Sequence, residues 1–402
     1  MRKYLLKLGN LWDFNQELPY ITNINTRFQH TYILGKTGTG KSVAMERYAH
    51  EDIKQGLSVI YIDPKGDSVK RLHHLHKCKY VSIKKPIVIN PLNKTGFDID
   101  EIISEFVQIL DILITLTASN PESTVLMREI VGMALRCFTK EQKNLHYLVD
   151  FLLYRNVRTN HVDKLSPEFE QYRNYWREFD FLEKNGYPRN KDKIESAKRV
   201  ASRLIEISEG KMRCIVQGDN ELYISDIVSK GESLLVDTSM MSRNSRIYLS
   251  NLIVYAVLSY CEYHEGETKP LIIYVDEFQT VVSPLFTELL ARSRSKKVGF
   301  VLAHHDFLEV SPQVMSSILG NTNTYIVFRC GLNEADKLAP MFDVSPKDLF
   351  NLPKYNAYVR IGNKNTKIRT FPPIMEEVPE LDIEIAPSPE LFSFLSDDWI
   401  VV

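Results

Sequence analysis

The chain has 402 residues, of which 44% are hydrophobic and 25% charged, and its formal net charge is −1. This composition is typical of globular proteins, and the length allows more than one domain or one domain with a large insertion. No stretch has the uncharged length that a bilayer requires, and the N-terminal apolar run is too short for a signal peptide. The five cysteines show no CxxC spacing, so we expect reduced thiols in a soluble, cytoplasmic protein.

Charge is distributed unevenly along the chain. From Ile374 to the end there are eight acidic residues and no Lys or Arg, and the rest has 50 basic and 43 acidic residues, a formal charge of +7. A mildly basic body favours contact with nucleic acid, although many proteins with that balance bind none. We expect residues 374–402 to form an acidic tail.

Strand-like and helical segments alternate in the first and last parts of the chain, the pattern of a parallel sheet with crossover helices. A strand at Thr31–Leu34 leads into a glycine loop, and a helix is predicted from Lys41 to about Gln55, before the stop signal Gly56. Further strands are predicted at 57–63, 233–237, 271–276, 298–304, 324–328, 358–361 and 367–371. The last two are expected to form a hairpin.

The strand pattern disappears over residues 98–230. Apolar residues recur there at helical spacing from Ile102 onward, with an interruption near Gly186. We therefore expect an α/β core with a mainly parallel sheet, made of residues 1–97 and 231–373. The residues between them are predicted to be an inserted all-helical domain.

The segment from Gly35 to Ser42 reads GKTGTGKS and fits the pattern G-x-x-x-x-G-K-[ST]. With Gly at about 7% of residues, a chance match is roughly a one-in-a-hundred event, and a glycine turn without a ligand is the simpler alternative. In a P-loop, backbone N–H groups curl around phosphates at a helix N-terminus. Lys41 would reach the β- and γ-phosphates of ATP, and Ser42 would ligate Mg²⁺. The predicted ATP-binding residues are Gly35, Lys36, Thr37, Gly38, Thr39, Gly40, Lys41 and Ser42.

A P-loop requires a second, acidic site. The strand that begins at Leu271 has five apolar residues followed by two carboxylates, Asp276 and Glu277. Asp276 would hold Mg²⁺ through water, and Glu277 would polarise the attacking water. A strand that ends in Asp-Glu is common by itself, and it becomes a strong signal only together with the P-loop. The adjacent glutamate favours an ATP-hydrolysing motor over a kinase or a GTPase switch.

In this order, the motifs resemble those of the HerA/FtsK superfamily of hexameric DNA-pumping ATPases, and within it the coupling proteins of type IV secretion and conjugation. The resemblance covers about residues 25–375. It is carried, in chain order, by His30, GKTGTGKS, YIDPKGD, INPL, LLVDTS, YVDEFQ, VLAHH, GNTNTYIVFRC, Asp336 and Leu338-Ala339. It implies a P-loop (RecA-like) core, ATP and Mg²⁺ as cofactors, and a homo-hexameric ring with ATP at the subunit interfaces.

The resemblance also suggests sensor and finger residues. Family members usually have Gln where this chain has His305, so we expect His305 to sense the γ-phosphate or the water, with Gln279 as the alternative. An arginine finger that acts across a subunit boundary is implied as well. Arg329 is the first choice, and Arg292 and Arg294 are the second, although each arginine could instead pair with a surface carboxylate.

These observations predict a DNA translocase that pumps single- or double-stranded DNA. A relaxase or secretion-channel and membrane proteins are the further partners, and recruitment to the inner face of the membrane is expected. Coupling proteins usually carry N-terminal membrane helices, and none is evident here, which favours a soluble HerA-like repair motor or a viral packaging ATPase as the alternative. A third alternative, an ATP-dependent scaffold that pumps nothing, is opposed by Glu277.

Overall fold

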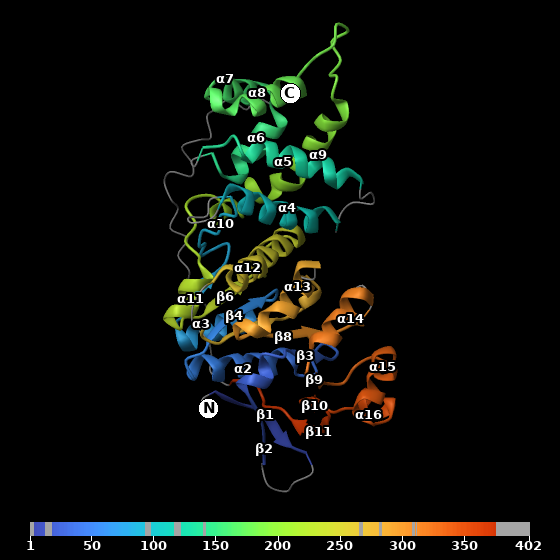
Figure 1. The fold of residues 1–402 in the computed structure, drawn as a ribbon. Helices are drawn as coiled ribbons and strands as arrows, with labels where there is room; N and C mark the ends of the chain where they lie inside the picture. The colour runs from blue at the N-terminus through green and yellow to red at the C-terminus, as the bar shows by residue number, and fades with distance from the viewer. Residues whose placement is uncertain are drawn as a thin grey trace, which may run out of the picture.

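The computed structural model describes residues 4–12, 18–92, 98–115, 122–139, 142–264, 268–280, 284–307, 310 and 312–374. The predicted acidic tail therefore lies outside the described residues, except for Ile374. Figure 1 shows two layers along the long axis of the molecule, a sheet with its flanking helices below and a stack of helices above. Among the described residues, no helix is both long and apolar enough to cross a membrane.

One eleven-stranded sheet organises the lower part, in the order β2-β1-β11-β10-β9-β3-β8-β7-β4-β6-β5. The strands from β9 to β5 run parallel, whereas β10, β11, β1 and β2 pair in antiparallel fashion. The strands are β1 Leu5–Leu11, β2 Pro19–Asn23, β3 Thr31–Leu34, β4 Ser58–Asp63, β5 Lys79–Val81, β6 Leu234–Asp237, β7 Leu271–Val275, β8 Val298–His304, β9 Thr324–Val327, β10 Asn356–Ile361 and β11 Lys364–Arg369. The predicted α/β fold with a mainly parallel sheet is confirmed.

Three strands were not expected from the sequence. β5 has only three residues, and β2 is a short strand at the edge of the sheet. In β1 the register shifts between Lys7 and Gly9, which breaks the period-two pattern that marks a strand. A Cβ at Gly9 would lie 2.5 Å from the carbonyl oxygen of Arg369, so this strand needs glycine to approach β11.

Helices cover both faces of the sheet and form the upper layer. They are α1 Ile24–Arg27, α2 Lys41–Lys54, α3 Asp67–His76, α4 Ile99–Thr115, α5 Glu122–Leu135, α6 Leu145–Leu153, α7 Arg155–Asp163, α8 Glu170–Phe179, α9 Lys191–Ser208, α10 Arg213–Val216, α11 Ile224–Lys230, α12 Arg243–Tyr263, α13 Pro284–Ser293, α14 Pro312–Asn321, α15 Leu332–Phe342 and α16 Pro346–Phe350. The named 3₁₀ turns in the described residues are η1 Pro167–Phe169, η2 Phe278–Thr280 and η3 Arg294–Lys296.

Alternate residues of the buried strands point into two apolar cores. Ile33 and Tyr61 pack with α2 and α3, whereas Tyr32, Ile60 and Ile62 belong to the core that contains α12 and α13. The second core continues into the helices of the upper layer. Two-sided burial explains why these strands are continuous apolar runs in the sequence.

Between β5 and β6 the named elements are helices, α4 to α11 with η1. Figure 1 shows α4 to α9 stacked above the sheet. The interruption near Gly186 is a tight turn between α8 and α9, with Gly186 at φ +81° and a bridge between Leu182 and Pro188. The division of the chain into a core and an inserted domain at residue 98 stays a prediction.

A buried ion pair ties α1 to α2 under the sheet. Arg27 donates to both carboxylate oxygens of Asp52 at 2.6 and 2.5 Å, and both side chains have almost no exposed surface. The hydroxyl of Tyr274 on β7 donates to Asp52 at 2.5 Å and accepts from Arg27 at 3.0 Å. Buried charges that are paired and hydrogen-bonded in this way hold the elements in one arrangement.

Candidate active site

The predicted site residues, apart from Arg292 and Arg294, gather at the carboxyl edge of the parallel strands. In the register of the sheet, Leu34 of β3 pairs with His304 of β8 and with Val327 of β9, while Val275 of β7 pairs with Ile62 of β4. The loops that follow these strands therefore open at one edge. This is where ligands bind in open α/β sheets.

The P-loop connects β3 directly to α2. Its start is fixed by neighbouring strand ends, since the N–H of Gly35 donates to the His304 carbonyl at 3.3 Å and that of Lys36 to the Arg329 carbonyl at 2.8 Å. Gly38 and Gly40 have φ of +78° and +120°, which side chains rarely adopt. The sequence thus forms the phosphate-binding turn that its glycines predict. Lys36, Thr37 and Gly38 are exposed at its tip.

Lys41 points back into the loop that precedes it. Its Nζ donates to the carbonyl oxygens of Gly35 at 2.5 Å and Lys36 at 3.2 Å. Burial lowers the pKa of Lys41, and the nearby Asp276 and Glu277 carboxylates oppose this effect. A buried ammonium at the centre of the loop is positioned to exchange these carbonyls for phosphate oxygens.

Ser42 and Asp276 are in direct contact across 234 residues of sequence. The Ser42 hydroxyl donates to Asp276 Oδ2 at 2.7 Å. Burial raises the pKa of Asp276, the hydrogen bond from Ser42 opposes this, and the neighbouring Glu277 charge adds to the rise. A hydroxyl and a buried carboxylate next to a P-loop are the oxygen ligands that Mg²⁺ takes in such sites, so this pair fits the ion.

Among the described residues, Lys65, Gln279 and His305 hold the carboxylate of Glu277. Lys65 donates to Oε1 at 3.2 Å, and Gln279 and His305 contact Oε2 at 2.9 and 2.8 Å. Burial raises the pKa of Glu277, but the hydrogen bonds from Gln279 and His305 and the charge of Lys65 outweigh it and lower the pKa to about 2. Its φ of +53° lies in the left-handed region, which places a non-glycine residue under strain at this turn.

The structure adds Asp63 and Lys65, which were not predicted as site residues. Asp63 ends β4 and accepts hydrogen bonds from the N–H groups of Lys65 and Ser68, both at 2.9 Å. Burial and the nearby Asp276 charge raise the pKa of Asp63 to about 6, against the effect of these N–H groups. By folding the turn, Asp63 presents Lys65 to Glu277. The motif YIDPKGD contains both residues, but their position beside Glu277 depends on β4 lying next to β7 in the sheet.

The candidate finger residues lie in two places. Arg329 follows β9 and is exposed, and its carbonyl accepts from Lys36, so it lies beside the P-loop of its own chain. Arg292 and Arg294 lie at the opposite, amino edge of the sheet, just before β8, and Arg292 pairs with Glu262. The structure brings Arg329 to the site and leaves the other two arginines away from it.

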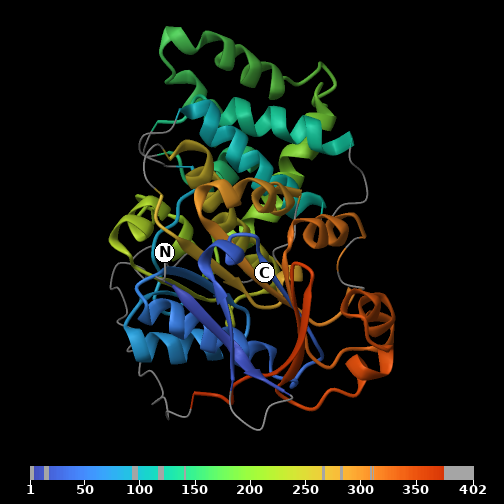
Figure 2. The same ribbon diagram turned by 60° about the horizontal axis from the view of Figure 1, so that its bottom comes forward.

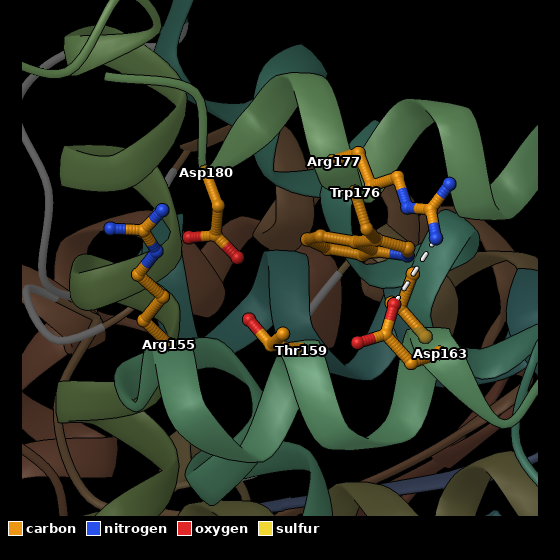
Figure 3. Close-up of a pocket in the computed structure, with 7 residues that line it drawn as sticks. Arg155, Thr159, Asp163, Trp176, Arg177 and Asp180 are labelled. Atoms are coloured by element: carbon orange, nitrogen blue, oxygen red, sulfur yellow. Dashed lines mark hydrogen bonds and ion pairs between the residues drawn. The ribbon is translucent and has the colours of Figure 1, made fainter.

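A separate cavity lies in the upper layer, between α7 and α8 (Figure 3). Its volume is about 160 Å³, and Arg177 pairs with Asp163 across it at 3.2 Å. It is lined by Arg155, Thr159, Val162, Asp163, Trp176, Arg177 and Asp180. None of the predicted site residues lines this cavity.

The fold matches solved structures over nearly the whole chain. The bacterial conjugative coupling protein TrwBΔN70 in its unbound form is 13% identical, covers 91% of this chain and 93% of its own, and superposes with a TM-score of 0.68. TrwB in complex with ADP and Mg²⁺ is 13% identical, with coverages of 91% and 94% and a TM-score of 0.66. VirB4 of Thermoanaerobacter pseudethanolicus is 14% identical, with coverages of 93% and 98% and a TM-score of 0.63.

At such identities these structures establish the fold alone, and no curated protein sequence matches this chain. The family model described as the central domain of the helicase HerA matches residues 6–257, more than half of the chain. That span contains the P-loop and the Asp63 turn, and the fold brings Asp276 and Glu277 beside them. The chain therefore belongs to the family of the HerA helicase central domain and is a P-loop ATPase of the HerA/FtsK type.

Proposed function

We propose that this ATPase is a motor that translocates DNA as a ring-shaped homo-hexamer, in the role of a coupling protein for conjugation or type IV secretion. The observation that carries the proposal is the contact of Ser42 with Asp276 beside Lys41, with Glu277 next in the chain. A site with one carboxylate to hold Mg²⁺ and a second carboxylate to activate water is suited to repeated ATP hydrolysis. The fold shared with a conjugative coupling protein supports the cellular role.

In this proposal, each residue has a defined task in ATP hydrolysis. The P-loop N–H groups and Lys41 hold the phosphates, and Ser42 and Asp276 hold Mg²⁺. When bound, Mg²⁺ neutralises charge on the β- and γ-phosphates. Glu277 orients a water molecule toward the γ-phosphorus and accepts its proton as the bond to the β-phosphate oxygen breaks. His305 and Gln279 hold Glu277 and sense the γ-phosphate through it.

The arginine finger is proposed to act between subunits, with residues 1–97 and 231–373 as the ring-forming core and 98–230 as an inserted helical domain. Arg329 is exposed beside the P-loop, so a neighbouring subunit that packs on this edge lies within its reach. Arg292 and Arg294, on the opposite edge, would instead reach into the site of the neighbour. Either arrangement makes the active site complete only in the assembled ring.

The proposal is tested by measuring hydrolysis with and without single- and double-stranded DNA, together with the mass of the oligomer in solution. We expect a hexamer whose ATPase rate rises when DNA is added, because an engaged strand orders the ring. A confirmed oligomer that binds no DNA, with a rate unchanged by DNA, would refute translocation and favour the scaffold.

A HerA-like motor for DNA repair is the second candidate, and the match to the HerA family model is the observation that favours it. The two roles differ in the DNA form that engages the motor. A rate raised mainly by single strands supports the coupling role, in which a single strand is exported. A rate raised mainly by duplex ends supports a role in repair.

A further inference from the structure

In β1 and β11 one face of the sheet lies in the core and the other is turned outward, whereas α15 packs against the corresponding face of β10. Ile368, Val359 and Leu8 belong to the core that contains α2. Because side chains alternate along a strand, Lys367 and Arg369 lie on the outer face of β11. Register places Tyr358 of β10 opposite Lys367, at the border of this face, where its ring also packs against Phe342 of α15 at 6.1 Å between ring centres. Figure 2 brings the ribbons of β1, β2, β10 and β11 toward the viewer.

Aromatic rings and cations alternate across this outer face. The Lys367 ammonium lies 4.4 Å from the ring centre of Trp12 and 5.8 Å from that of Tyr358, and the Arg369 guanidinium lies 5.1 Å from Trp12. Lys7 on β1 lies 5.0 Å from the ring of Phe371. We call this set the ladder face: Lys7, Trp12, Tyr358, Lys367, Arg369 and Phe371.

The charge of the ladder face is of one sign. The four strands β1, β2, β10 and β11 contain five basic residues and no Asp or Glu. Among the described residues, no ion pair joins Lys7, Lys367 or Arg369 to a carboxylate. The charge of Lys367 helps to lower the pKa of Asp348 on α16, although hydrogen bonds from Ser345 are the larger cause. Within the part of the chain that the structure describes, the ladder cations thus have ring partners and no paired carboxylate.

We propose that the ladder face binds single-stranded nucleic acid, an inference that rests on the proposed function in DNA transport. Lysine and arginine neutralise phosphates at any sequence, and flat rings stack on unpaired bases. A duplex offers only its phosphates to such a face, because its bases are stacked on one another. Exposed Leu5 and Ile21 lie nearby, which makes an anionic membrane the competing occupant. The half-buried rings, packed against cations, favour nucleic acid instead.

A short hydrogen-bonded path joins the ladder face to the P-loop. Thr370 follows Arg369, and its N–H and hydroxyl donate to the Tyr355 carbonyl at 2.7 and 3.0 Å. The N–H of Tyr355 in turn donates to the Thr39 carbonyl at 2.9 Å. A strand bound at Arg369 therefore lies two hydrogen bonds from the phosphate-binding turn, so the ladder face transmits DNA binding to the ATPase rate.

The test uses the full chain and a fluorescent oligothymidylate of about 20 nucleotides, with binding followed across a salt series. Lys367→Gln/Arg369→Gln is compared with the matched pair Lys77→Gln/Lys84→Gln near β5, at the other end of the sheet. We expect the ladder variant to bind about tenfold more weakly, with a salt slope lower by about 1.4 for two lost phosphate contacts. Its hydrolysis without DNA should equal that of the wild type, while stimulation by DNA is lost.

Replacements of Trp12 separate stacking from charge. Trp12→Ala should weaken binding of the single strand by about tenfold and leave binding of a duplex unchanged, whereas Trp12→Phe should retain most of the affinity. Thermal unfolding shows whether each variant is folded. If the double variant Lys367→Gln/Arg369→Gln does not fold, the single variant Lys367→Gln is used in its place.

Three outcomes would overturn the inference. The first is an equal loss of binding in the ladder and control pairs, and the second is unchanged binding in the ladder variant while DNA still stimulates hydrolysis. The third is binding of anionic phospholipid vesicles, lost in the ladder variant, by a protein that does not bind the oligonucleotide. A wild-type oligomer with neither DNA binding nor DNA-stimulated hydrolysis would instead refute the proposed function, and the inference with it.

Discussion

Replacing Glu277 by Gln tests the assignment of the second acidic motif with the smallest change of shape. The amide can still accept the hydrogen bonds from Gln279 and His305 through its oxygen, since both contact the same carboxylate oxygen at 2.9 and 2.8 Å. The Lys65 ammonium lies 3.2 Å from the other oxygen of Glu277. In the variant the NH₂ group takes the place of that oxygen, so two donors face each other and this hydrogen bond is lost. The side chain stays in place but cannot accept a proton.

Loss of a general base lowers turnover by about two or more orders of magnitude, which corresponds to about 2.7 kcal/mol or more of transition-state free energy. Binding of ATP should change by less than about threefold, because the groups that hold phosphate and Mg²⁺ remain. These are Lys41, Ser42 and Asp276. Phosphate release gives the turnover number, and titration with a fluorescent ATP analogue gives the affinity.

Glu262→Gln is the matched control, because Glu262 also pairs with a cation, Arg292, but lies away from the P-loop edge. It should hydrolyse ATP at the wild-type rate. If Glu277→Gln also turned over at close to the wild-type rate, Glu277 would not be the base, and the interpretation of the second motif would be wrong.

Four further outcomes are expected. Lys41→Ala should abolish hydrolysis, measured as phosphate release, because the β- and γ-phosphates lose their ammonium. Arg329→Ala should lower turnover about a thousandfold with little change in the affinity for ATP. A mixture of this protein with the Lys41→Ala protein should recover activity if the two co-assemble. No recovery in mixed rings would exclude a finger that acts between subunits. Truncation after Pro373 should tighten oligonucleotide binding at low salt, because it removes eight acidic residues. Arg27→Ala should lower the free energy of unfolding by about 3–5 kcal/mol in urea, since it leaves the Asp52 charge buried and unpaired.

The sequence predicted the central strands well because each is an apolar run with sharp ends. β3 and β8 have the predicted bounds, and β4, β6, β7 and β9 differ from them by one residue. The P-loop was predictable because its glycines, its Lys and its Ser lie close together in the chain. Local sequence fails at β1 and β2, because β1 pairs with β2 through a register shift and with β11 through contacts more than 300 residues away in the chain.

Spatial neighbours in the site could be predicted only where a family motif names them. Ser42 and Asp276 are 234 residues apart, and Lys65 and Glu277 are 212 apart. The order of the strands, with β4 beside β7 and β7 beside β8, decides which loops meet. The strand order depends on crossover connections that include whole helices, so it cannot be predicted from a short sequence motif. Asp63 and Lys65 were part of a recognised motif, yet their chemical role appears only with this neighbourhood.

The surroundings of Glu277 set a condition on catalysis. The hydrogen bonds from Gln279 and His305 and the charge of Lys65 lower the pKa of Glu277, so in the proposed mechanism these contacts must loosen before Glu277 accepts a proton. Gln279 and His305 come from the short turns next to β7 and β8 and contact one carboxylate oxygen of Glu277, whereas Lys65 contacts the other. Lys65 is also half exposed, and the phosphates of ATP at the P-loop would compete for its ammonium. In the proposed mechanism, the turn that Asp63 folds would therefore link occupancy of the P-loop to release of the Glu277 carboxylate.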